Sequence, residues 1–180
     1  MTTFISLLRG INVSGKNKIK MQELRALYEA LGFHEVQSYV QSGNVVFASD
    51  TINANALAAC IAQGIKKEFG LEVPVLVFSY EHFAEMVQSN PFCQSGSRDE
   101  KAIYYTFLAE KPADFAEAAL RSKMLPEEEI YLSERVVYLY CPQSYSDTKL
   151  SNNFLESKLK VTATTRNLRT CNTLLEMGNE

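Results

Sequence analysis

The sequence predicts an α+β fold built from two tandem β-α-β-β-α-β subdomains and a C-terminal helix. Runs rich in β-branched and aromatic residues alternate with helical periodicities, in the same order in each half of the 180-residue chain. The hairpins Tyr39–Phe47 and Ile130–Tyr138 also resemble each other in sequence at a constant offset of 91. This element order is that of a ferredoxin-like subdomain, and its recurrence predicts a duplication.

The first half contains the clearer signals. An apolar run ends at Arg9-Gly10, and leucines at helical spacing precede Gly32, which is a helix stop. Ser42-Gly43 is a hairpin signal between two strand-like runs, and Pro74 favours either an edge strand or the first residue of a strand. The expected elements are strands at 3–8, 36–41, 44–48 and 73–78, and helices at 21–31 and 54–69.

The second half repeats this order after a bridging helix and a linker. We expect an N-terminal ferredoxin-like subdomain at 1–79, a bridge at 80–99 and a C-terminal ferredoxin-like subdomain at 100–180. The expected elements of this half are strands at 102–108, 129–132, 136–141 and 161–164, and helices at 113–120, 151–159 and 166–177.

Length and composition exclude several classes of protein. No apolar run approaches the ~20 residues that cross a bilayer, and the short opening stretch, interrupted by Arg9, is typical of a buried strand rather than a signal peptide. We therefore expect a cytoplasmic protein with no membrane partner. No pair of cysteines has Cys-x-x-Cys spacing, so we expect no metal, no cofactor, and thiols that are buried or half-buried. The sequence does not predict an oligomeric state.

Charge is segregated along a chain whose net charge is −3. The first twenty residues contain four basic side chains and no acidic one, and residues 149–170 contain five basic side chains against Glu156 alone. The rest of the chain is therefore acidic. Such segregation creates a local positive field on an acidic protein, which makes the two basic segments the predicted working surface.

The first basic segment lies between a predicted strand and a predicted helix start, where backbone N–H groups and the helix dipole attract anions. An arginine there can offer a fork to phosphate, although turns also favour Asn and Gly. The spacing matches neither a Walker A loop nor a Gly-x-Gly-x-x-Gly fingerprint. The ligand-binding residues predicted here and at the first hairpin tip are Arg9, Asn12, Lys16, Asn17, Gln41 and Asn44.

The second basic segment lies at two predicted helix starts, near residues 151 and 166. Helix capping accounts for one or two of its polar residues. It does not account for the cations, because positive charge at a helix N-terminus opposes the dipole unless a bound anion offsets it. The ligand-binding residues predicted here are Lys149, Asn152, Asn153, Thr165, Arg166 and Asn167.

Several motifs occur together in one order: Leu7-Leu-Arg-Gly-Ile-Asn-Val13, Gly15-Lys-Asn-Lys18, Tyr39-Val-Gln-Ser-Gly-Asn-Val-Val-Phe47, Asn90-Pro-Phe92, Lys149-Leu-Ser-Asn-Asn-Phe154 and Ala163-Thr-Thr-Arg-Asn167. With them the sequence resembles the domain of unknown function 1697 family, a group of mostly bacterial proteins. The resemblance implies an α+β fold of paired subdomains and no assigned activity. Two positions depart from the family pattern: Ser14 stands where Gly is frequent, and Leu168 where an aromatic residue commonly follows Arg-Asn.

Three functions stay open. The favoured one is binding of a small anionic ligand that bears phosphate or a nucleotide, with nucleic acid as a second ligand class. No strand resembles the aromatic RNP1 pattern, and the acidic balance favours a compact pocket over a long duplex footprint. The second is a phosphoryl or acyl-phosphate hydrolase using Arg9 with Asn12 or Asn44, by analogy with acylphosphatases. The third is a protein-interaction module without ligand chemistry.

Overall fold

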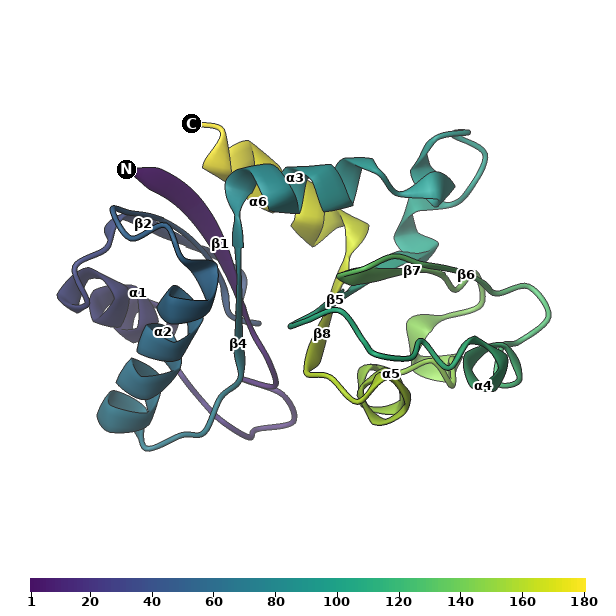
Figure 1. Cartoon of the computed structure of the whole chain (residues 1–180), viewed down its shortest axis with the longest axis horizontal. Helices are drawn as coiled ribbons and strands as arrows, with labels where there is room; N and C mark the ends of the chain where they lie inside the picture. The colour runs from purple at the N-terminus through teal and green to yellow at the C-terminus, as the bar shows by residue number, and fades with distance from the viewer. The chain divides into compact units, whose positions relative to one another are not determined.

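The computed structural model describes all 180 residues, and the chain divides into two compact units. Unit 1 comprises Met1–Glu85 and Asn172–Glu180, and unit 2 comprises Met86–Cys171. Each unit contains one four-stranded antiparallel sheet, and the two sheets have equivalent strand orders. The fold is therefore mixed α+β, as predicted, with two sheets and six α-helices (Figure 1). The subdomain boundaries expected from the sequence stay a prediction.

Unit 1 is built on a sheet of order β2-β3-β1-β4. The central strand β1 pairs antiparallel with both β3 and β4, which places β4 at an edge, one of the two positions that Pro74 favours. Helix α3 continues across the boundary into unit 2. The elements are β1 (Thr2–Leu8), α1 (Met21–Ala30), β2 (His34–Tyr39), β3 (Asn44–Ser49), α2 (Ala54–Phe69), β4 (Val75–Ser79) and α3 (Tyr80–Gln88).

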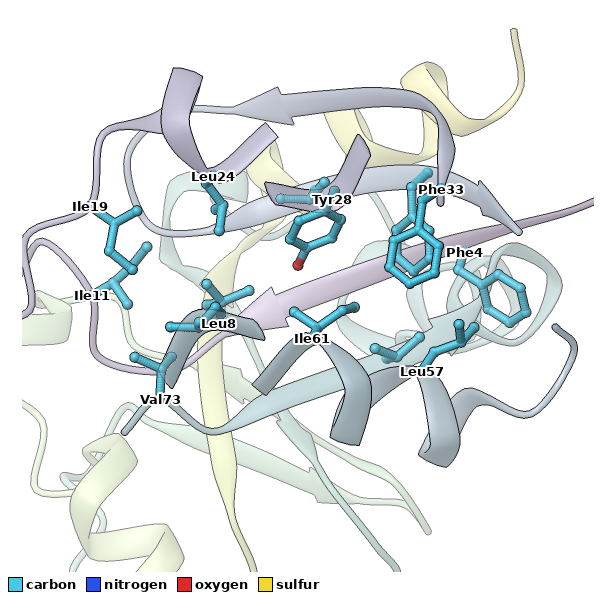
Figure 2. Close-up of a cluster of buried hydrophobic side chains, with 14 of the residues drawn as sticks. Phe4, Leu8, Ile11, Ile19, Leu24, Tyr28, Phe33, Leu57, Ile61 and Val73 are labelled. Carbon is cyan, nitrogen blue, oxygen red and sulfur yellow. The ribbon is translucent and has the colours of Figure 1, made fainter. Parts of the chain in front are cut away.

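The core of unit 1 combines side chains of its sheet with those of α1 and α2 (Figure 2). Ser6 is buried in β1, and its hydroxyl lies 2.7 Å from that of Tyr28, so each polar group has a partner. Burial raises the pKa of Tyr28. Figure 2 shows Ile11 and Ile19 at one end of this cluster. Both ends of the segment between them are thus anchored in the core.

Unit 2 repeats the arrangement with a sheet of order β6-β7-β5-β8 and its own buried cluster. Three 3₁₀ turns, at Pro91–Cys93, Glu100–Ala102 and Tyr145–Asp147, join its elements. The elements are β5 (Ile103–Leu108), α4 (Glu117–Arg121), β6 (Glu129–Leu132), β7 (Val136–Tyr140), α5 (Asn152–Leu159), β8 (Ala163–Asn167) and α6 (Leu168–Gly178), whose last turns belong to unit 1.

The two predicted boundaries of unit 2 that differ most from the structure are a helix start and a strand end. The helix expected at 113–120 is α4, which begins only at Glu117, because the Asp114 carboxylate accepts from the Ala116 N–H (2.9 Å) and Ala116 has a left-handed backbone. The strand expected to end at 164 continues to Asn167, because Tyr105 and Tyr104 of β5 pair with its last two residues.

The cysteine prediction is also partly wrong. Cys141 and Cys171 are buried as expected, but Cys60 and Cys93 are exposed. Cys60 lies on α2, whose buried stripe is formed by Leu57, Ile61 and Ile65, so this position falls outside the stripe. Burial raises the pKa of Cys141 to about 12, which keeps that thiol protonated at neutral pH.

Candidate functional site

The first basic segment forms the loop between β1 and α1, residues 9–20. Where β1 ends, the Leu8 N–H donates to the Gly43 carbonyl (2.9 Å) and the Arg9 N–H donates to the Pro74 carbonyl (3.0 Å). Gly43 has a φ of +83°, and a Cβ there would lie 2.6 Å from the Leu8 Cβ. Only glycine fits this approach, so the loop and the β2–β3 turn form one joined structure.

The loop follows an unusual backbone path. At its tip the Lys16 N–H donates to the Val13 carbonyl (2.9 Å) across Ser14 and Gly15, which both have positive φ, as in a type I′ turn. Ser14 therefore adopts the left-handed backbone conformation that favours glycine. The residues of this loop with positive φ are Gly10, Asn12, Ser14, Gly15 and Asn17.

Asn12 holds the loop in place with three hydrogen bonds. Its Nδ2 donates to the carbonyls of Ile19 (2.9 Å) and Gln41 (2.8 Å), and its Oδ1 accepts from the Ile19 N–H (2.9 Å). The Asn17 Nδ2 likewise donates to the Gly10 carbonyl (3.0 Å). Both N–H bonds of the Asn12 amide are used inside the fold, so its first role is to fix the backbone of the loop.

The β2–β3 turn carries the other predicted residues of this end. Asn44 is buried, and its Nδ2 donates to the Tyr39 carbonyl (3.1 Å) and the Ser42 hydroxyl (2.8 Å). Gln41 is exposed, and its carbonyl accepts from Asn12. Val40 is 49% exposed at a φ of 51°, which β-branched residues rarely adopt. The structure thus gathers the six residues predicted in the first half at one end of the unit 1 sheet.

The exposed charges of this end are lysines. Lys16, Lys18 and Lys20 are all exposed, and none takes part in an ion pair of the molecule. Arg9 is half-buried. Lys20 is also the residue before α1, and no side chain caps that helix start. Lys18 and Lys20 are not among the predicted ligand-binding residues, although the charge count of the first twenty residues contains them.

The second basic segment lies in unit 2, along the start of α5 and on β8. Ser151 caps α5, since its hydroxyl accepts from the Phe154 N–H (3.2 Å). The Asn152 Nδ2 donates to the Ala163 carbonyl (2.9 Å), and its Oδ1 accepts from the Thr165 hydroxyl (3.0 Å). The Thr165 hydroxyl also lies 2.8 Å from that of Thr106. These bonds join α5 to the sheet, while Lys149 and Asn153 are exposed.

Arg166 and Asn167 are strand residues and do not lie inside the last helix. Arg166 is only 8% exposed, its Nη1 donates to the Thr164 hydroxyl (2.6 Å) and the Thr165 carbonyl (3.0 Å), and burial lowers its pKa to about 10. The Asn167 Oδ1 accepts from the Thr170 N–H (2.8 Å) at the start of α6. The dipole argument for bound anion at residue 166 therefore does not apply. Ligand binding by these residues stays a prediction.

The six predicted residues of the first segment thus belong to unit 1, and the six of the second segment belong to unit 2. No three His, Cys, Asp or Glu side chains are grouped to hold a metal ion. None of the helices combines the length and hydropathy that a bilayer crossing needs.

Two pockets of unit 1 contain none of the predicted ligand-binding residues. The first is lined by Thr3, Glu35, Gln37, Val46, Phe47, Met177, Gly178 and Glu180, and the second by Glu23, Ala26, Leu27, Ala30, Glu68 and Phe69.

Comparison with known proteins gives a family but no activity. The model of the family described as "Protein of unknown function (DUF1697)" matches residues 1–138, which include the first basic loop and both hairpins. A solved structure described as the conserved bacterial protein SP0830 from Streptococcus pneumoniae is 28% identical, with 98% of each chain covered and a TM-score of 0.77. No curated protein matches the chain.

Proposed function

The chain belongs to the DUF1697 family, whose description assigns no activity, and we propose that it binds a phosphate-bearing anion at the β1–α1 loop of unit 1. The binding residues in this proposal are Lys16, Lys18 and Lys20, with Gln41 beside them. Arg9, Asn12, Asn17 and Asn44 position the loop that presents them.

One observation carries this proposal: the fold uses the asparagines of the loop and leaves its lysines without acidic partners. In unit 2 the equivalent β5–α4 loop contains Lys111, whose Nζ lies 3.5 Å from the Glu134 Oε1 in the β6–β7 turn. At the unit 1 end there is no such carboxylate, and three lysines are exposed on a backbone fixed by Asn12. Unpaired cations held close together create the positive potential that attracts phosphate.

The hydrolase alternative has less support. A water-positioning amide needs a free N–H or carbonyl oxygen directed at the substrate. Both N–H bonds of Asn12 and both of Asn44 donate inside the fold, and Asn44 is buried. Binding without hydrolysis is therefore the function that the geometry favours.

The test is calorimetric titration of the full chain with tripolyphosphate, together with thermal unfolding in the same buffer. Removal of the three cations in K16A/K18A/K20A should weaken binding by a factor of about 3 to 150, since each exposed ion pair contributes roughly 0.2–1 kcal/mol. The matched control is K67A/K101A/K123A, which removes three exposed lysines elsewhere and the same net charge. This control should bind as the unaltered protein does.

Equal weakening in both triple variants would show that net charge alone matters and would contradict the proposed site. Absence of any saturable tripolyphosphate binding by the unaltered protein would contradict it as well. Circular dichroism of each variant identifies a loss of fold, and N12D, which keeps the side-chain acceptor of Asn12, provides a second, conformational perturbation of the same loop.

Three finer expectations belong to this proposal. We infer that each unit is a ferredoxin-like subdomain, supported by the element order and by the strand orders β2-β3-β1-β4 and β6-β7-β5-β8. We place the protein in the cytoplasm, as the sequence predicts. Lys149, Asn152, Asn153, Thr165, Arg166 and Asn167 form a second candidate surface, of which Lys149 and Asn153 are the exposed members.

A further inference from the structure

We propose, on the basis of the function above, that the natural ligand of the β1–α1 loop is a single-stranded nucleic acid. Its phosphodiester backbone would lie along Lys16, Lys18 and Lys20, and its bases or sugars would contact Val13 and Val40. This narrows the anion from a compact phosphate to a linear polyanion with apolar faces.

Lys16, Lys18 and Lys20 occupy every second position of the loop, and this series is the lysine row. Lys18 and Lys20 flank Ile19, which is buried, and Lys20 has an extended backbone. Residues on either side of a buried position in an extended stretch point to the same side, about 7 Å apart. Lys16 lies at the base of the loop tip, where its N–H donates to the Val13 carbonyl, and the Lys18 Cε would lie 3.8 Å from a Cβ at Gly15 of that tip. A row of flexible point charges suits successive phosphates of a strand better than a single ion.

Three amides of this end that could donate to a compact ligand make hydrogen bonds within the fold. Small-molecule sites are concave and contain a few precisely placed polar groups. The amides of Asn12, Asn17 and Asn44, which could have served, donate to carbonyl or hydroxyl groups of the fold. The two pockets described for unit 1 contain glutamates and no lysine or arginine. The lysine row therefore lies outside these two pockets.

Two exposed apolar side chains lie beside the row. Val13 is 57% exposed and Val40 is 49% exposed, and they are two of the five large hydrophobic residues exposed in the whole chain. Each neighbours one partner of the Asn12–Gln41 hydrogen bond, so the two turn tips that carry them are joined. Exposed apolar groups among cations fit a ligand that alternates charge with apolar faces, as a nucleic-acid strand does.

A single strand fits better than a duplex. Bases and sugars of a duplex are stacked inside, whereas a single strand exposes them to protein side chains. A duplex also calls for a long basic footprint, and the chain as a whole has a net charge of −3. A short row of cations on an acidic protein therefore favours a brief contact with a flexible strand.

The experiment measures binding of a fluorescein-labelled 12-nucleotide oligouridylate by anisotropy between 50 and 200 mM KCl. Three phosphate contacts predict a slope of log K against log salt of about −2, which is a loss of roughly 20-fold across this range. In K16A/K18A/K20A the slope should fall to near zero. In V13S/V40S the salt slope should stay at about −2 and the affinity for the oligouridylate should fall about threefold. The control I52S, at another exposed apolar residue, should bind as the unaltered protein does.

Separate outcomes address the inference and the function it rests on. If tripolyphosphate binds through the lysines but the oligonucleotide binds no tighter, the inference of a nucleic-acid ligand is wrong and the proposed anion site is retained. If neither ligand depends on the lysines, both fail. Tighter binding to a 12-base-pair duplex, or to vesicles containing phosphatidylserine with no oligonucleotide binding, would also overturn the strand in favour of another polyanion.

Discussion

The β1–α1 loop of unit 1 and the β5–α4 loop of unit 2 start from the same backbone arrangement. The Leu8 and Leu108 N–H groups each donate to a carbonyl of the neighbouring hairpin, at 2.9 Å in both cases. The next N–H groups, of Arg9 and Ala109, each donate to the segment before the edge strand, at 3.0 and 2.8 Å. Beyond that point the loops differ in length, conformation and charge.

This difference distinguishes the loop features that the sheet requires from those that occur in unit 1 alone. Unit 2 forms its sheet with Ala109 where unit 1 has Arg9, and within its shorter loop the Ala116 N–H donates to the Asp114 carboxylate (2.9 Å). Unit 1 has a longer loop with left-handed residues, three bonds to Asn12 and unpaired lysines. Since unit 2 forms its sheet without these features, they are candidates for function.

The largest effect is expected from Gly43→Ala. The added Cβ would meet the Leu8 Cβ at 2.6 Å and the Ile11 Cδ1 at 2.9 Å, at a φ of +83°. Crowding and the left-handed backbone together should lower the free energy of unfolding by about 3 kcal/mol. Glu134→Ala, at the position 91 residues later in the equivalent turn, should change it by less than about 0.5 kcal/mol. Urea denaturation measures the free energy of unfolding of both variants. Equal losses of stability would contradict the contrast between the two turns.

Asn12→Ala should be the next most damaging change. It removes three hydrogen bonds that join the loop to itself and to the Gln41 carbonyl, which should cost about 2–3 kcal/mol. Asp114→Ala removes one side-chain hydrogen bond of the unit 2 loop and should cost about 0.5–1 kcal/mol. Hydrogen exchange at the Ile19 N–H should accelerate in the first variant alone. Unchanged protection there would mean that Asn12 does not hold the loop.

A smaller effect, on binding only, is expected from Gln41→Glu. This places a carboxylate on the turn beside the lysine loop, as Glu134 stands near Lys111 in unit 2. Gln41 is exposed and only its backbone carbonyl is used, so unfolding should change by less than about 0.5 kcal/mol. Tripolyphosphate affinity should fall about fivefold, roughly 1 kcal/mol. Gln41→Ala is the control, and an equal loss there would point to the amide instead of charge.

The elements that the sequence predicts well are those with local start and stop signals. Helix α2 has the predicted bounds, because Asn53 caps its start and Gly70, with a φ of 68°, ends it. The β8–α6 boundary was missed because the pairing of Tyr104 with Asn167 is a contact between distant residues. Local secondary-structure propensity carries no information about pairing between distant strands.

The residues of the proposed site were named from the sequence, but the structural roles of its amides were not. Charge counting found the loop, and turn chemistry found Asn12 and Asn17. An amide that binds a ligand and an amide that binds a carbonyl seven or twenty-nine residues away give the same sequence pattern. The sequence also could not show that Arg166 is buried while Lys18 and Lys20 are exposed.

The most direct test of the central claim is a titration of the ¹⁵N-labelled full chain with tripolyphosphate, followed by backbone amide shifts in both units. The unit 1 loop should respond in saturable fashion at residues 13–20 and 40–43, and the β5–α4 loop at 109–116 should not respond. Shifts that favour the unit 2 loop, or that spread equally over both units without saturation, would contradict an anion site at the β1–α1 loop.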